Sequence, residues 1–141
     1  MVGMIVTGHG SFASGITSGL KLLAGELQDY QPVDFTPEDS VDSLTQKLSC
    51  ALDELQGCDG VLIFADLAGG SPFNVSVRLK MERKQEILVI GGANLPSVLN
   101  AFMTREMSET AEKLASDSLI AGKDAMVCFT GSSDEDNEYE E

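Results

Sequence analysis

The sequence has little cysteine and a single histidine, and it contains no tryptophan. Its three cysteines, Cys50, Cys58 and Cys128, form no Cys-x-x-Cys pair and have no histidine beside them. This spacing argues against a zinc site or a redox dithiol, and an odd number of scattered thiols favours a reducing compartment. Long apolar runs are also absent: no stretch approaches the roughly 18 apolar residues that span a bilayer, and no signal-peptide pattern opens the chain. We therefore expect a cytoplasmic protein.

Positive charge is scarce as well. Nine Lys and Arg residues stand against 23 Asp and Glu, which gives a formal net charge of -14. A domain this acidic repels a phosphate backbone, so nucleic acid is excluded as a partner. Six of the acids lie within residues 134–141. We expect an acidic disordered tail over residues 132–141 and one globular domain over residues 1–131.

Short apolar runs alternate with segments of helical periodicity. The pattern predicts strands at residues 4–7, 33–35, 61–65 and 86–90, and helices at 13–27, 41–55, 72–80, 96–103 and 108–121. Leu23 and Leu119 are among the leucines expected on buried helix faces. The alternation is typical of an α/β fold, a mostly parallel open sheet with helices on both faces. Residues 126–129 predict a last strand, at a sheet edge or paired with another subunit.

Three glycine-containing loops follow predicted strands, at residues 8–11, 66–71 and 91–94. Ligands of open α/β sheets bind at the carboxyl ends of the strands, where loops lead into helix starts. Glycine allows close backbone approach, and a helix start offers unpaired N–H groups with a positive dipole end. This edge of the sheet therefore suits an anion such as a phosphoryl group.

His9 stands between two glycines directly after the first strand. A lone histidine is more often structural than catalytic, but this position is too exposed for a core residue. A neutral imidazole is a nucleophile, and a carboxylate that holds one ring nitrogen leaves the other with its lone pair outward. Asp66, which directly follows the third strand, reaches His9 if the two strands are neighbours. The alternative for Asp66 is a helix cap or a turn residue.

Gly69, Gly70 and Ser71 have two compatible interpretations. The glycines make a tight connection and Ser71 is an N-cap, or the same amides and hydroxyl bind a phosphoryl oxygen. Together with Gly10 and Ser11, they are our predicted phosphoryl-binding residues.

A dinucleotide-binding fingerprint is also matched, by Gly8, Gly10 and Ala13 with Asp34 about 20 residues on. It leaves the glycine-rich run after Asp66 unexplained, but a nucleotide-binding regulatory module stays open as an alternative. A histidine phosphatase needs arginines for its phosphate. No arginine lies near a predicted strand end, since the three are Arg78, Arg83 and Arg105.

From residue 4 to about 129, the chain resembles the IIA component of the mannose-type phosphotransferase system, with its mannose, fructose, sorbose and N-acetylgalactosamine branches. The resemblance is carried by Gly8-His9-Gly10, by the strand at residues 61–65 with the run Asp-Leu-Ala-Gly-Gly-Ser-Pro-Phe-Asn at 66–74, and by the loop at 91–96. The phosphocarrier subunit of dihydroxyacetone kinase shares the fold and the histidine. The Gly-Gly-Ser-Pro-Phe-Asn run favours the sugar branch.

The resemblance implies a role for each part of the site. His9 would be the phosphorylated residue and Asp66 its support, with Ser71 and nearby amides holding the phosphoryl group. His9 would take this group from HPr and pass it to the IIB component, which serves membrane-embedded IIC and IID components. No metal or other cofactor is implied. Members form homodimers that exchange a C-terminal strand, which predicts an exchanged, antiparallel strand at residues 126–129.

Overall fold

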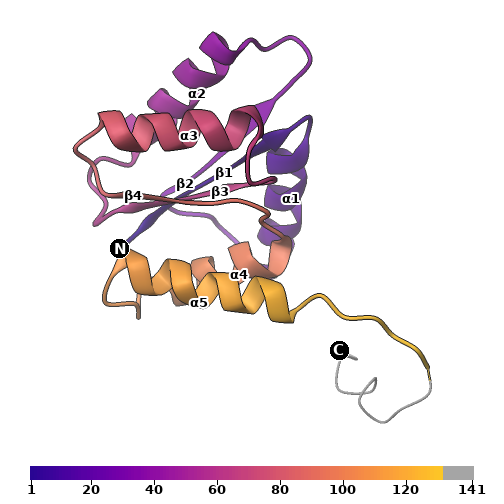
Figure 1. Cartoon of the computed structure of the whole chain (residues 1–141). Coiled ribbons are helices and arrows are strands. Elements are labelled where there is room, and N and C mark those ends of the chain that lie inside the picture. Colours follow the sequence, from indigo (N-terminus) through magenta and orange to yellow (C-terminus); the bar gives the residue numbers. More distant parts are fainter. Residues whose placement is uncertain (132–141) are drawn as a thin grey trace.

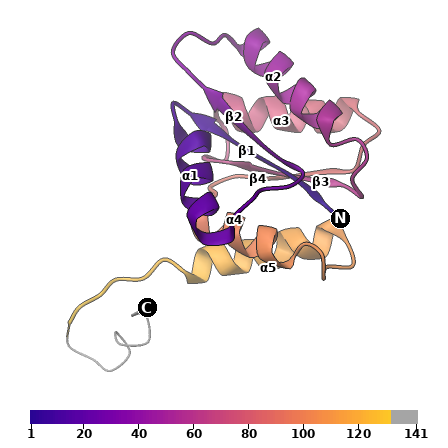
Figure 2. The ribbon, with the colours of Figure 1, turned by 180° about the vertical axis from the view of Figure 1, so that it is seen from behind.

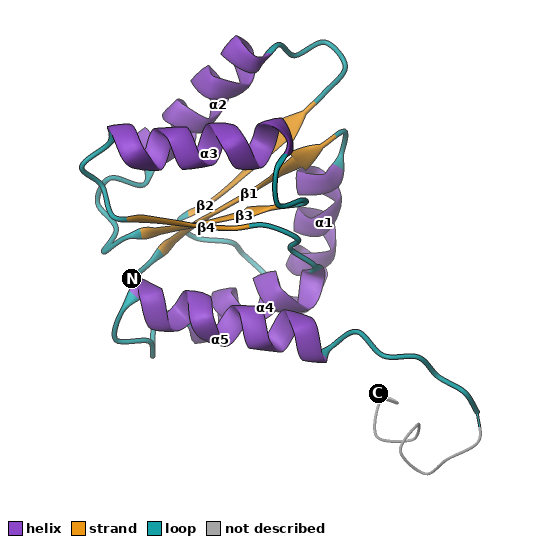
Figure 3. Cartoon of the chain, in the orientation of Figure 1, coloured by secondary structure: helices purple, strands orange, loops and turns teal. Residues whose placement is uncertain are grey.

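The computed structural model describes residues 1–131, and the predicted acidic tail at 132–141 lies outside the described residues. Strands and helices alternate along the chain before two final helices (Figures 1 and 3). In chain order the elements are β1 (Gly3–His9), α1 (Phe12–Ala24), β2 (Tyr30–Phe35), α2 (Val41–Glu54), β3 (Val61–Ala65), α3 (Gly70–Glu82), β4 (Ile87–Ile90), α4 (Leu95–Thr104) and α5 (Ala111–Asp124).

The four strands form one parallel sheet in the order β2-β1-β3-β4. Helices α2 and α3 cover one face, while α1, α4 and α5 cover the other (Figures 1 and 2). Successive residues of a strand face opposite sides, so Ile5 and Ile63 pack under α2 and α3, whereas Val6 and Phe64 pack toward the other helices. The predicted α/β fold is confirmed, and β1 and β3 lie side by side at its centre.

Two element boundaries differ from the prediction for local reasons. Helix α1 ends at Ala24, three residues early, because Gly25 takes φ +81°, a backbone conformation that glycine adopts readily and that stops a helix. Strand β2 begins at Tyr30, before Pro32. A proline is tolerated there because β2 is an edge strand and one side of it needs no ladder hydrogen bond.

The prediction that Leu23 and Leu119 face the core is wrong. Leu23 is 57% exposed and Leu119 is 40% exposed. At 3.6 residues per turn, each lies roughly a quarter turn from the centre of the buried stripe of its helix. Among the described residues, no helix has the length and apolar character needed to cross a membrane.

Residues 126–129 form no strand within the chain, so an edge strand there, as one form of the prediction had it, is wrong. Helix α5 ends at Asp124, and the segment then runs away from the sheet (Figure 1). A strand needs a neighbouring strand for its backbone hydrogen bonds, and the path of this segment takes its amide and carbonyl groups away from β4. Met126 and Phe129 are 87% and 68% exposed. Exchange of this strand with a second subunit stays a prediction.

Candidate functional site

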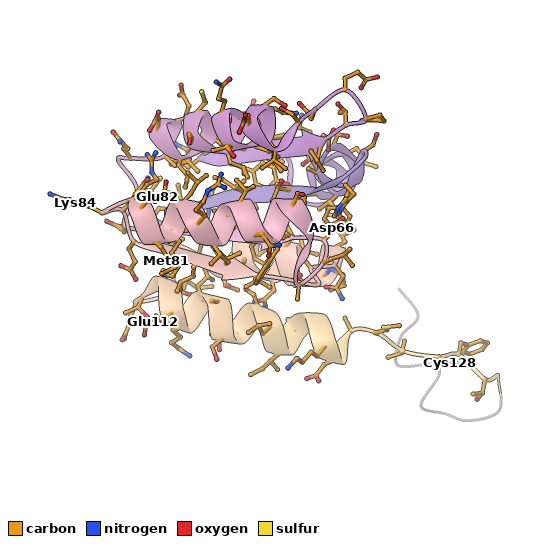
Figure 4. All side chains as sticks on the ribbon, turned by 45° about the horizontal axis from the view of Figure 1, so that its top comes forward. Asp66, Met81, Glu82, Lys84, Glu112 and Cys128 are labelled. Carbon is orange, nitrogen blue, oxygen red and sulfur yellow. The ribbon has the colours of Figure 1, made fainter. Side chains whose placement is uncertain are left out.

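The loops after β1 and β3 meet at the carboxyl end of the sheet. Because Thr7 pairs in register with Ala65, the next residues along the two strands, Gly8 and Asp66, lie opposite one another. His9 ends β1, and Asp66 begins the loop that leads into α3 (Figure 4). The fold thus brings the predicted nucleophile and its predicted carboxylate partner together.

Asp66 holds His9 by two hydrogen bonds to the same oxygen. Its Oδ2 accepts from the backbone N–H of His9 and lies 2.9 Å from the ring Nδ1, the same distance as to the backbone nitrogen. The His9 side chain is 45% exposed, whereas that of Asp66 is 14% exposed. Burial raises the pKa of Asp66, but the two contacts with His9 outweigh it, so this pKa lies below its ordinary value of 3.8.

The ionised state of Asp66 decides how the imidazole is presented. A carboxylate only accepts hydrogen bonds, so Nδ1 must be the protonated nitrogen that donates to Oδ2. In the neutral imidazole Nε2 then carries the lone pair, and Nε2 has no hydrogen-bond partner among the described residues. In that form the site presents one unprotonated ring nitrogen to the surface.

Gly8 provides the space in which this pair forms. A Cβ at position 8 would lie 2.9 Å from Cγ of Asp66 and 2.6 Å from Cδ2 of Phe12. Both distances are shorter than real side chains allow, so any larger residue would push the carboxylate or the aromatic ring aside. The first glycine of the Gly-His-Gly motif is thus required by close packing.

The start of α3 lies against the imidazole. Gly69 and Gly70 take φ +92° and +76°, and a Cβ on Gly70 would lie 3.1 Å from Cε1 of His9 and 3.5 Å from Nε2. The N-cap is Gly69, so the simple interpretation of Ser71 as the cap is wrong. Gly70 and Ser71 have first-turn N–H groups without intrahelical partners, and the Ser71 hydroxyl makes no hydrogen bond within residues 1–131.

The other predicted phosphoryl-binding residues differ in what they offer. Gly10 donates its N–H to the carbonyl of Phe35 at 2.8 Å. This amide is therefore not available to a phosphoryl oxygen, and Gly10 has a structural role in the turn. Ser11 is exposed at the N-cap of α1 and makes no side-chain capping bond. In the third loop, Asn94 caps α4 and donates to the carbonyl of Gly122, which makes it a structural residue.

Asp34, the acidic residue of the dinucleotide fingerprint, has a different task. Its Oδ1 accepts the backbone N–H of Ser14 at 3.0 Å, in the first turn of α1. A dinucleotide fingerprint requires this helix start to be free for the pyrophosphate. The contact therefore weighs against the nucleotide-binding alternative.

Phe35 is a site residue that the sequence prediction missed. Its ring lies edge-on to the His9 ring, with centroids 5.9 Å apart and planes at 68°. Phe35 ends β2 and pairs in register with His9, which ends β1. The signal in the sequence was an aromatic residue at the end of the second predicted strand. The register that brings its ring to His9 depends on the folded sheet.

The fold and the site together define a class: a parallel α/β domain that presents one carboxylate-held imidazole at the carboxyl edge of its sheet, beside a helix start. A family model described as "PTS system fructose IIA component" matches residues 3–118, and the chain belongs to this family of phosphotransferase-system IIA components. The resemblance to mannose-type IIA components is thereby confirmed.

Proteins named for several different sugars are similar to this chain in sequence. The chain is 27% identical over 125 residues to the mannose-specific EIIAB component of Escherichia coli K12, covering 89% of this chain but only 38% of that protein. It is 32% identical over 96 residues to the sorbose-specific EIIA component of Lacticaseibacillus casei, covering 68% of each.

Solved structures of phosphotransferase-system IIA proteins have the same fold as this chain. The EIIA component from Streptococcus agalactiae superposes with a TM-score of 0.85 at 30% identity, covering 92% of this chain and 98% of that one. The mannose/sorbose-specific IIA subunit from Enterococcus faecalis gives a TM-score of 0.80 at 28% identity, with 89% and 92% covered.

Proposed function

We propose that this chain is a cytoplasmic phosphocarrier of sugar uptake, which accepts a phosphoryl group from HPr on His9 and passes it to a IIB component. The observation that carries the proposal is the contact of Nδ1 with ionised Asp66, which leaves Nε2 as the nucleophile. Relatives named for mannose, sorbose and fructose favour a sugar system over a dihydroxyacetone kinase. The IIB component would in turn serve membrane IIC and IID components.

The transfer is an in-line displacement at phosphorus. The Nε2 lone pair forms a new bond to the phosphorus of phosphorylated HPr, and the old N–P bond breaks with its electron pair staying on the nitrogen of HPr. Because Nδ1 keeps its proton, the His9 ring becomes a cation. The Asp66 carboxylate at 2.9 Å offsets this charge. Transfer to a nucleophile of IIB reverses these changes and returns a neutral imidazole.

The start of α3 supplies the groups for the phosphoryl oxygens. Gly70 borders Nε2, and the unpaired N–H groups of Gly70 and Ser71, with the Ser71 hydroxyl, lie in the first turn. Backbone donors at a helix start favour anions through both hydrogen bonds and the helix dipole. We assign these groups, and not the amide of Gly10, to the transferred phosphoryl group. Ser11, at the start of α1, is a second hydroxyl of the same edge.

We further propose a homodimer in which residues 126–129 are exchanged as an antiparallel strand on β4. The outer edge of β4 carries no proline, whereas the opposite edge strand β2 contains Pro32, which lacks a donor. Met126 already borders a hollow of about 350 Å³ beside Ile90 and Leu119. Val127 and Phe129 are apolar and exposed, as expected of a segment that pairs elsewhere.

The phosphorylation assay tests the proposal directly. Incubation with phosphoenolpyruvate, Enzyme I and HPr should label the chain with one phosphoryl group, and His9→Ala should remove the label. Ser18→Ala changes an exposed side chain on α1 whose hydroxyl donates to the carbonyl of Gly15 in the same helix, and this control should label like the unchanged protein. Equal labelling of His9→Ala would reject His9 as the acceptor.

A further inference from the structure

We propose that Phe35 is a positioning residue, which holds the His9 imidazole against the start of α3 and keeps water from one side of the phosphorylated ring. The inference rests on the proposed function for its effect on phosphohistidine. Its effect on the ring itself is independent of phosphorylation.

The backbone on both sides of the ring is tied to Phe35. His9 pairs in register with Phe35 across β1 and β2, and the next residue, Gly10, donates its N–H to the Phe35 carbonyl. Beyond this backbone pairing, the Phe35 side chain packs against the core under α2 and α3. The phenyl ring is therefore anchored at the end of β2, beside the end of β1 that carries His9.

Three elements then surround the imidazole. Asp66, after β3, holds Nδ1 on one side, and Phe35, at the end of β2, contacts the ring edge-on from the other. Gly70, at the start of α3, borders Cε1. Asp66 holds only Nδ1 of the ring and the backbone nitrogen of His9. Because the His9 side chain is 45% exposed, Asp66 alone would leave the far end of the ring free to move. The phenyl ring closes the direction that Asp66 and Gly70 leave open.

The Phe35 ring matters most once His9 is phosphorylated. In hydrolysis, a water oxygen bonds to phosphorus while the Nε2–P bond breaks, and its electron pair returns to Nε2. The water protons go to the phosphate product and to solvent. A phenyl ring beside the imidazole excludes water from that side without offering a group that assists its attack. A phosphocarrier needs this protection because its phosphoryl group must survive from the encounter with HPr to the encounter with the IIB component.

The first measurement is the ¹⁵N spectrum of the imidazole, which is unambiguous because the chain has one histidine. The unchanged protein should show a single Nδ1–H tautomer. Phe35→Leu, which keeps an apolar side chain, and Phe35→Ala should both keep this tautomer, which Asp66 selects, but show broadened ring resonances because the far end of the ring moves. Phe102→Leu is the matched control, since Phe102 is also a half-buried ring edge-on to another ring, Tyr30, and should leave the spectrum unchanged.

The second measurement is the lifetime of the phosphorylated chain after removal of Enzyme I and HPr. Both Phe35 variants should shorten it roughly two- to tenfold, the factor that matches one aromatic pair, while Phe102→Leu should not. Ring resonances as narrow as those of the unchanged protein in folded Phe35→Leu and Phe35→Ala overturn the inference, as does an equal effect of Phe102→Leu. If the unchanged protein takes no label, the proposed function fails, and the ring spectrum alone decides the role of Phe35.

Discussion

Among single residues, Asp66 controls how His9 is presented. It holds the imidazole and selects the tautomer with Nδ1 protonated, and in the proposed mechanism it supplies the negative charge that offsets the phosphorylated ring. These three tasks need different properties of one side chain: reach, acceptor character and ionisation. Substitutions that remove them one at a time separate the tasks.

Asp66→Asn keeps the size and an acceptor oxygen but removes the charge. We expect the variant to fold and to accept the phosphoryl group about 10- to 100-fold more slowly, the worth of a charge-assisted hydrogen bond. Asp66→Ala should be slower still. Because the pKa of Asp66 is lowered, the unchanged protein should keep this advantage at every pH above the ordinary value of 3.8 and lose it only as pH falls through the lowered pKa. Unchanged transfer kinetics in both variants would remove the proposed role of Asp66.

Gly8 tests whether the pair depends on space. Gly8→Ala places a methyl group 2.9 Å from Cγ of Asp66, so we expect a loss of about 1–3 kcal/mol in the free energy of unfolding, with slower phosphorylation. Gly15→Ala is the control, since a Cβ at this position, near the start of α1, meets nothing within 4 Å and should stabilise the chain by about 0.4–1 kcal/mol. Denaturant melts measure both. A Gly8→Ala variant as stable as the unchanged protein would contradict the packing argument.

At the scale of elements, the junction between β2 and α2 secures the strand end that carries Phe35. Asp39 accepts hydrogen bonds from the Thr36 backbone, from Lys47 and from Ser43, in that order of effect, and these lower its pKa far below the ordinary 3.8. Ser40 and Ser43 close a capping box at the start of α2. The connection is thus held by side chains of the loop and the first two turns of α2.

The lowered pKa of Asp39 predicts a pH-dependent stability. A carboxyl whose folded pKa is lowered stabilises the fold above its unfolded pKa, and the contribution is lost as pH falls through the folded pKa. Asp39→Asn should therefore lower the melting temperature at pH 7, and its difference from the unchanged protein should shrink below about pH 4. Glu38→Gln, at an exposed neighbour, is the control. A difference that does not change with pH would show that the charge of Asp39 contributes nothing.

The central elements follow from the sequence because their physics is local. Residues 61–65 are an unbroken apolar run, as a strand buried on both faces requires, and a parallel sheet brings the ends of neighbouring strands together, which predicts the pairing of His9 with Asp66. Phe35 was missed because its contact depends on the register of β2 against β1. Likewise, the glycine N-cap and the capping role of Asp34 depend on the path of each loop, which residue types alone do not determine.

For the whole molecule, the proposed exchange of residues 126–129 predicts the oligomeric state. Light scattering should give a dimer, and Val127→Pro should shift it toward monomer, since proline removes a ladder donor. Val127→Thr retains strand propensity and should leave the dimer intact. A dimer unaffected by Val127→Pro would place the interface elsewhere, and a monomeric unchanged protein would reject the exchange.

The central claim is that Nε2 of His9 carries the phosphoryl group because Asp66 occupies Nδ1. The most direct test phosphorylates the ¹⁵N-labelled chain with phosphoenolpyruvate, Enzyme I and HPr, and reads the attachment site from the coupling of ³¹P to the imidazole nitrogens. We predict one phosphoryl group, bonded to Nε2, with Nδ1 still protonated. A phosphoryl group on Nδ1, or on any residue other than His9, would contradict the account.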